Sequence, residues 1–198
     1  MKKEDMRTIR TRKSLRKALY NLMEKEPVEK ISVTDICNEA EINRVTFYTH
    51  YNDKYELLND LLKEVFKKIS SYNKQIYEQI KTGDPIRDFT IVISHSIYKV
   101  CFENKNIVNS INNYDNRLFV ETLENVVINS GLDVLEEVKN NFTFKYPEKF
   151  IINFLFGGFS KLIEYGLKND ELTEKEFLEY VDTFFYSLLK KEIFFIKK

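Results

Sequence analysis

The sequence predicts an all-α protein, and three observations lead to this fold class. Apolar residues recur at spacings of three and four along most of the chain, as in Leu15, Ala18, Leu19, Leu22 and Met23. Glycine and proline, which interrupt helices, number only 5 and 3 in 198 residues. No segment has the convincing apolar–polar alternation of a half-buried strand. With 43% hydrophobic residues, the chain can bury one or two compact helical cores.

Two helices are predicted at the N-terminal end. The first covers about residues 7–25, and Pro27 lies beyond its end. The second begins at the capping-box variant Ser32-Val33-Thr34-Asp35, in which a hydroxyl cap is followed three residues later by an acid. Its apolar residues, which we expect to face inward, are Val33, Ile36, Cys37 and Ala40.

A third short helix follows after only three residues. Asn43 can cap it, and it runs from Arg44 to about Tyr51, with Phe47 and Tyr51 one turn apart and turned inward. Two short helices joined in this way, behind a supporting helix, have the plan of a helix-turn-helix. If Phe47 and Tyr51 are buried, the polar residues on the opposite face have no partner in the core.

The remaining residues are predicted to form a helical bundle. Its helices are expected at 54–72 after an Asp53 cap, at 85–102 after an Asp84 cap, at 105–113, at 115–130, from Pro147, and after the capping box Thr173–Glu176. Gly131 breaks the chain, and residues 131–146 give an ambiguous pattern.

The charge of the chain is unevenly distributed although the net charge is zero. Residues 1–54 hold 12 basic and 9 acidic residues, a net of +3, whereas residues 55–198 hold 19 and 22, a net of −3. A basic end beside an acidic body is typical of a small nucleic-acid-binding head attached to another kind of domain. A solvated charged arm explains the same distribution equally well.

Residues 32–58, SVTDICNEAEINRVTFYTHYNDKYELL, resemble the tetracycline-repressor (TetR) family of bacterial transcription regulators. The similarity is strongest over about residues 8–66 and rests on Tyr48, the aromatic Tyr51 and Lys54 at the family's spacing. The C-terminal part matches only in length, helicity and two aromatic-rich final helices. The family usually has glycine in the inter-helix turn, whereas Ala40-Glu41-Ile42 has none, so a non-glycine residue is expected to adopt a left-handed conformation there.

The resemblance implies a helix-turn-helix domain over residues 1–53 (family-style extent about 8–68) and a helical effector-binding and dimerisation domain over 54–198. The third helix would enter the major groove of double-stranded DNA. The side chains suit that role, since Arg44 can pair with guanine O6 and N7 and hydroxyls can donate to phosphates. Lys54, beside a helix N-terminus, suits a phosphate. The predicted DNA-binding residues are Thr34, Asn43, Arg44, Thr46, Tyr48, Thr49, His50 and Lys54.

Each of these residues also has a purely structural interpretation. Thr34 can simply stabilise its helix, Tyr48 can pack with its hydroxyl in water, and Lys54 can be a surface lysine. The DNA-binding interpretation is favoured for Arg44, Tyr48 and Lys54, while the two interpretations stand about even for Thr34, Thr46, Thr49 and His50.

The last two helices are apolar around more of their circumference than one core requires, which favours a homodimer with a two-fold axis. The predicted interface residues are Phe154, Leu162, Phe177, Val181, Phe184 and Leu188. Aromatic-rich helices can also line a pocket, and the candidate wall residues are Phe66, His95, Tyr98, Phe102, Tyr114 and Phe119. The resemblance implies a repressor that binds a near-palindromic operator and is released by an unidentified small-molecule effector.

An enzyme is not expected. The two histidines, His50 and His95, lie far apart in sequence without companions at metal-ligand spacing, so neither a metal nor a cofactor is predicted. Gly157-Gly158 lacks the Lys-Ser/Thr of a phosphate-binding loop. A helical adaptor whose head binds protein rather than DNA remains the alternative function.

The sequence also bears on where the protein acts. No charged-then-apolar leader opens it, and its longest uncharged stretch, Phe150 to Ser160, is shorter than the roughly 20 residues of a membrane-spanning helix. Cys37 and Cys101 are expected to be reduced packing residues. We therefore expect a soluble cytoplasmic protein with no membrane partner.

Overall fold

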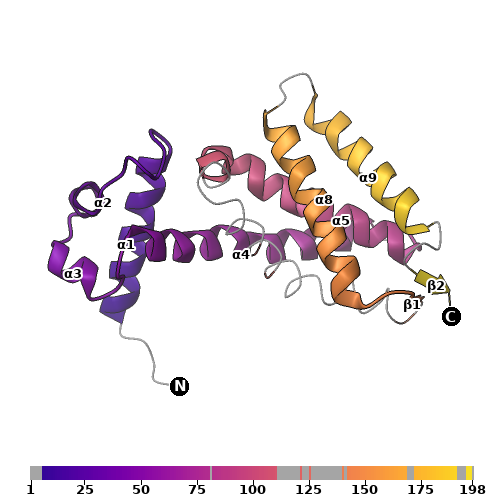
Figure 1. The fold of residues 1–198 in the computed structure, drawn as a ribbon, viewed down its shortest axis with the longest axis horizontal. Coiled ribbons are helices and arrows are strands. Elements are labelled where there is room, and N and C mark those ends of the chain that lie inside the picture. Colours follow the sequence, from indigo (N-terminus) through magenta and orange to yellow (C-terminus); the bar gives the residue numbers. More distant parts are fainter. Residues whose placement is uncertain are drawn as a thin grey trace. The chain divides into compact units, whose positions relative to one another are not determined.

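The computed structural model describes residues 6–80, 82–110, 121, 125, 140, 142–168, 172–190 and 195–197 (Figure 1). The chain divides into two compact units. The first comprises Met1–Val65 with Asn106–Phe119, and the second comprises Phe66–Lys105 with Val120–Lys198. We call the first unit the head and the second the body. The functional division at residue 53 stays a prediction, because compactness alone does not assign a function.

The head contains α1 (Met6–Met23), α2 (Val33–Ala40), α3 (Arg44–Tyr48) and the first turns of α4 (Lys54–Ile80). The predicted helix-turn-helix is present, with α1 packed against α2 and α2 against α3. One apolar core joins these helices, and its fully buried side chains include Leu15, Leu19, Ile31, Ile36, Phe47, Leu57 and Leu58. The helical residues 106–110 also belong to the head, where the Ser110 hydroxyl accepts a hydrogen bond from the Val28 N–H at 3.1 Å.

Local side-chain chemistry sets the boundaries of α2 and α3. Ser32 and Asp35 form the reciprocal capping box at the start of α2. Glu41 ends α2 with φ 55° and ψ 40°, the left-handed conformation that a turn without glycine was expected to require. The Asn43 side chain then caps α3 by accepting from the Val45 N–H at 2.8 Å. These three caps fix the direction in which α3 leaves α2.

The described core of the body is helical. Its central helix, α5 (Pro85–Glu103), begins at the predicted Asp84 cap and packs against α8 (Glu148–Lys168) and α9 (Glu174–Lys190). Tyr98 of α5 stacks on Phe177 of α9 at 4.9 Å between ring centroids. Gly166 of α8 leaves room for the same Phe177 ring, because a Cβ atom at residue 166 would lie 2.5 Å from it. Helix α5 is therefore the helix that both α8 and α9 contact.

Three features of the fold differ from the expectations or fall outside the described residues. Helix α4 continues to Ile80, eight residues beyond the predicted end at Tyr72. Two three-residue strands, β1 (Phe142–Phe144) and β2 (Phe195–Lys197), pair antiparallel with Phe142 opposite Lys197. The predicted helix at 115–130 and the end of the one at 105–113 lie largely outside the described residues.

None of the described helices is long and apolar enough to span a lipid bilayer. Cys37 of α2 and Cys101 of α5 are both free thiols buried in the core, so their predicted packing role is confirmed.

Candidate nucleic-acid interface

Two aromatic residues anchor α3 and its C-terminal extension in the head. The Phe47 side chain is fully buried and Tyr51 is only 2% exposed, with 5.9 Å between their ring centroids. Tyr51 lies three residues beyond the end of α3, and its N–H still donates to the Phe47 carbonyl at 3.0 Å. The inward orientation predicted for this pair is present, so the opposite side of α3 faces away from the core of the head.

The outer side of α3 is formed by exposed side chains. Arg44, Val45, Tyr48 and Thr49 are all exposed, with Val45 at 73% and Tyr48 at 50%. Within the described part of the chain, no hydrogen bond or ion pair engages the side chains of Arg44 or Tyr48. This outer face thus combines an exposed cation, isopropyl group, phenol and threonine, and only the Tyr48 ring has an aromatic neighbour, Phe47, at 5.4 Å between centroids among the described contacts.

The other predicted contact residues surround this face. Asn43 and Thr34 are exposed, while Thr46 and His50 are partly buried. Asn43 uses its carbonyl oxygen to cap α3, which leaves its two amide N–H donors for another partner. The Thr49 hydroxyl donates to the Thr46 carbonyl at 2.6 Å. Thr49 therefore has no second hydroxyl proton for a phosphate, although its oxygen can still accept.

Lys54 has hydrogen-bond partners that the sequence did not indicate. Its Nζ donates to three backbone carbonyls in the loop before α2: Val28 at 2.8 Å, Glu29 at 2.9 Å and Ile31 at 2.7 Å. An ammonium has three donors, so all three are in use. The adjacent Tyr55 and Glu56 amides donate to the Asp53 carboxylate at 2.8 Å each. The predicted phosphate contact at Lys54 would have to displace these partners.

A carboxylate beneath α3 ties three segments of the head together. Asp60 of α4 accepts from the Tyr51 hydroxyl at 2.5 Å and from the Arg16 guanidinium of α1 at 2.9 Å. The Arg12 guanidinium lies 5.6 Å from the centroid of the Tyr51 ring. Burial acts to raise the pKa of Asp60, but the hydrogen bonds from Tyr51 and Arg16 outweigh it and hold this pKa below its usual value. Burial, reinforced by the Asp60 bond, raises the pKa of Tyr51.

The four predicted effector residues that the structure describes do not line one common pocket. Phe66 is fully buried and Tyr98 is packed on Phe177, so both are core residues of the body, whereas Phe102 is about half exposed. Tyr114 and Phe119 lie outside the described residues. His95 alone lines a groove of about 580 Å³ between α5 and α9. The other residues around that groove are Arg87, Thr90, Ile91, Lys175, Leu178, Glu179, Asp182, Thr183 and Tyr186.

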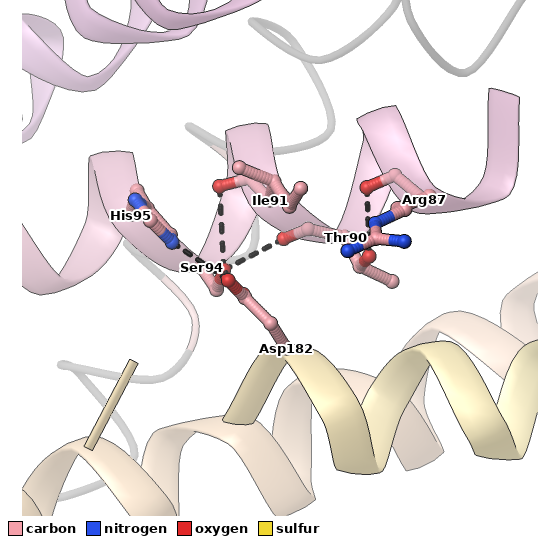
Figure 2. A network of polar contacts seen from close by, with 6 residues as sticks. All are labelled: Arg87, Thr90, Ile91, Ser94, His95 and Asp182. Atoms are coloured by element: carbon pink, nitrogen blue, oxygen red, sulfur yellow. Dashed lines mark hydrogen bonds and ion pairs between the residues drawn. The ribbon is translucent and has the colours of Figure 1, made fainter. Parts of the chain in front are cut away.

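His95 and Asp182 line the groove, and the buried Ser94 bonds to the same aspartate, which raises the question of catalysis. Figure 2 shows the Asp182 side chain reaching from α9 toward Ser94 and His95 of α5. The Ser94 hydroxyl donates to one carboxylate oxygen at 2.5 Å, and His95 Nε2 lies 2.7 Å from the other. In a nucleophilic triad the histidine would contact the serine. Here both residues bind the aspartate, so the set joins two helices and has no activated nucleophile.

The predicted dimer residues divide into two groups. Phe154 of α8 and Phe184 of α9 are 56% and 58% exposed, so both are available to a second copy. Phe177 and Val181 are buried in the body itself, and Leu188 packs against the cluster of Ile86, Ile151 and Leu189, as part of the core of the same chain. Leu162 is partly buried.

No protein-family model matches the chain. A 63-residue segment, 31% of the chain, is 40% identical to the uncharacterized helix-turn-helix-type transcriptional regulator YxbF of Bacillus subtilis, and it spans 17% of that protein. A 71-residue segment, 36% of the chain, is 34% identical to DhaS of Lactococcus lactis, a helix-turn-helix-type activator of the dhaKLM operon, and spans 38% of it. The chain thus matches well under half the length of these curated relatives.

Similar folds extend over nearly the whole chain. A crystal structure assigned to a TetR-family regulator of Syntrophomonas wolfei covers 90% of this chain and 94% of its own, with a TM-score of 0.69 and 20% identity. The structure of RolR in complex with resorcinol covers 92% and 88%, with a TM-score of 0.57 and 16% identity. The Syntrophomonas wolfei neighbour and both curated relatives are described as transcriptional regulators, the class that the sequence resembles.

Proposed function

We propose that this chain, which has the all-α fold of the TetR-family transcriptional regulators, binds duplex DNA through α3 as a homodimer and represses transcription. One observation carries the DNA-binding part of the proposal. Burial of Phe47 and Tyr51 leaves Arg44 and Tyr48 exposed on the outer side of α3, without a hydrogen-bonding partner among the described residues. A guanidinium and a phenol on a short projecting helix suit base edges and phosphates in a major groove.

We assign the DNA contacts according to which side-chain groups still have a hydrogen-bond donor available. Arg44 is assigned to a base edge, and Tyr48 with the Asn43 amide to the phosphate backbone. Thr34, Thr46 and His50 flank this face and remain candidate contacts. We assign Lys54 to holding the loop before α2, because its three donors already have carbonyl partners.

The homodimer is supported by the outward faces of α8 and α9. Phe150, Phe154 and Tyr165 are exposed on α8, while Tyr180 and Phe184 are exposed on α9. Five exposed aromatic residues on two neighbouring helices of the sequence are more than solubility favours, and aromatic residues are enriched at interaction surfaces. Two α3 helices related by a two-fold axis would match a near-palindromic operator.

Two glycines on the same face of α8 give independent support for the homodimer. Gly157 and Gly158 are exposed, and a Cβ atom on either would meet no other atom within 4 Å. Each glycine costs a helix about 1 kcal/mol relative to alanine. The described part of the chain offers no reason for that cost, whereas the close approach of a second helix would require side chains this small.

The proposal also covers the direction of regulation and the effector. Occupying an operator is sufficient for repression, whereas activation needs a further surface for the transcription machinery, so we infer a repressor. The relative DhaS is an activator, and a reporter gene downstream of the operator will distinguish the two. RolR binds resorcinol in its crystal structure; by analogy, the body is proposed to hold a small-molecule effector that changes DNA affinity.

The first experiment selects DNA fragments bound by the full chain from the host genome and measures their affinity by fluorescence anisotropy. Arg44→Ala should lower affinity and relax the preference at one base pair, whereas Tyr48→Ala should weaken binding to all sequences. Lys67→Ala removes an equal charge from an exposed position of α4 and serves as the matched control. Wild-type affinity should fall steeply with added salt, because phosphate contacts release counterions.

The adaptor hypothesis gives a different result in the same assay. A protein-binding head has no affinity for duplex DNA even at low salt. Unchanged affinity in both the Arg44→Ala and Tyr48→Ala variants would remove α3 as the contact surface.

A further inference from the structure

Val45 is the most exposed large hydrophobic side chain in the described part of the chain. Its exposed fraction is 73%, higher than that of any aromatic residue on the outer faces of α8 and α9. It lies between Arg44 and Thr46 near the start of α3, on the outer side that also carries Tyr48 and Thr49. An isopropyl group thus projects from the middle of an otherwise polar surface.

The fold of the head does not require this side chain. The core contact of α3 is made by Phe47, which is fully buried, and the start of the helix is fixed by the bond from the Val45 N–H to the Asn43 side chain. That bond involves only the backbone of residue 45. A β-branched residue is also a weaker helix former than alanine, lysine or glutamate, so valine brings no local advantage at an exposed position.

The chemistry of the major groove restricts what such a side chain can contact. Base edges in that groove present hydrogen-bond donors and acceptors, and the one apolar group among them is the C5-methyl of thymine. An isopropyl group cannot pair with the donors or acceptors and would only desolvate them. If α3 lies in the groove, Val45 enters it next to Arg44, and its single favourable partner there is a thymine methyl.

We propose that Val45 is a specificity-determining residue that reads the methyl group of a thymine, next to the base contacted by Arg44. This inference rests on the proposed function, because it assumes that α3 lies in a major groove. It adds a preference that hydrogen bonding cannot supply: each operator half-site carries a thymine at one fixed position relative to the base read by Arg44.

Replacing thymine by deoxyuridine tests the proposal, because the two bases differ only in the methyl group. Each thymine of a selected operator is replaced in turn, in both half-sites, and the Kd is measured for the full-length wild type and for Val45→Ala. Burial of about one methyl group is worth roughly a fourfold change in affinity, or roughly 15-fold when both half-sites are changed. We expect that loss in the wild type at one position per half-site, and a clearly smaller loss at that position in Val45→Ala, whose single methyl group makes less contact.

A second variant separates the apolar contact from the shape of the side chain. Val45→Thr keeps the branching and one methyl but introduces a hydroxyl, so it should retain only part of the preference for thymine over deoxyuridine. Neither variant touches the core, and both should have the wild-type melting temperature.

The outcomes distinguish this inference from the function on which it rests. Tight operator binding with equal responses of wild type and Val45→Ala to every deoxyuridine would overturn the role of Val45 and leave the proposed function intact. A selected operator without thymine near the Arg44-dependent base pair would do the same. Absence of any sequence-specific duplex binding would overturn both.

Discussion

The head and the body use polar groups and aromatic residues in opposite ways. In the head, the charged groups beneath α3 are closely partnered: Lys54 binds three carbonyls, and Asp60 binds Tyr51 and Arg16. The body instead leaves large aromatic residues exposed along α8 and α9. A rigidly held head suits a surface that must present α3 in one orientation. A body with uncovered aromatic residues suits association with a second chain, which would complete its core.

The largest expected effect comes from removing the aromatic anchor of α3. Phe47→Ala should destabilise the head by about 3–5 kcal/mol, because it empties a fully buried site. Tyr48→Ala, one residue along and half exposed, should cost only about 1 kcal/mol, because it loses the edge-on contact of its ring with Phe47. Hydrogen exchange checks this, since head amides should lose protection in Phe47→Ala while the described helices of the body keep theirs. Similar destabilisation by the two variants would contradict the orientation of α3.

The second prediction concerns Lys54. Lys54→Met keeps most of the aliphatic stem but removes three hydrogen bonds from a charged donor, leaving the carbonyls of Val28 and Ile31 partly buried without this partner. We expect a loss of about 2–3 kcal/mol in the free energy of unfolding of the head. Lys30→Met, at an exposed position of the same loop, should change it little. If DNA affinity falls in Lys54→Met while stability does not, Lys54 contacts phosphate after all.

Lys54 also illustrates what sequence reasoning can and cannot predict. The caps at Ser32, Asn43 and Asp84 lie within a few residues of the groups they bind, so these helix starts were predicted correctly. The three carbonyl partners of Lys54 are separated from it by more than 20 residues, and only the folded head brings them to the ammonium. The sequence therefore predicted that Lys54 begins a helix, but it could not predict which groups the ammonium binds.

The same limit applies to the body. Aromatic residues at helical spacing have one sequence pattern whether they fill a core or cover a surface, and the structure puts Phe66 and Phe177 in the core but exposes Phe154. The β1–β2 pair joins two three-residue strands about 50 residues apart, too short to show alternation. The long extension of α4 was predictable, since residues 73–80 contain neither glycine nor proline and the first breaker is Gly83.

A third prediction tests the charge beneath α3. Asp60→Asn should cost about 1–2 kcal/mol near neutral pH, because the amide keeps an acceptor for Tyr51 but loses its ion pair with Arg16. The pKa of Asp60 is lowered in the folded chain, so its ionised form favours folding. That contribution is complete above the unfolded pKa of about 4 and is lost as the pH falls through the lower folded pKa.

Unfolding measured across this range provides the test. The stability difference between wild type and Asp60→Asn should shrink as the pH falls below about 4. Glu164→Gln in α8 is the matched control from the body: its partners Lys161 and Lys168 are 66% and 47% exposed, so the substitution should cost no more than about 0.5 kcal/mol. An Asp60→Asn difference independent of pH would show that the carboxylate acts through its shape alone.

The smallest expected effect on the stability of the chain comes from replacing Gly157, which should nevertheless change dimer formation. Gly157→Ala should stabilise an isolated chain by up to about 1 kcal/mol, because alanine is the better helix former and its Cβ meets nothing within 4 Å. In the proposed dimer the same methyl group would separate two closely packed helices, and Gly157→Leu should separate them further. Sedimentation over a concentration range should therefore show weaker association in the order wild type, alanine, leucine, without loss of helicity. Lys67→Leu, at an exposed position on α4, controls for a bulky surface side chain. Equal association in all four proteins would mean that the glycine face of α8 is not the dimer contact, and the exposed aromatic residues would then need a different partner.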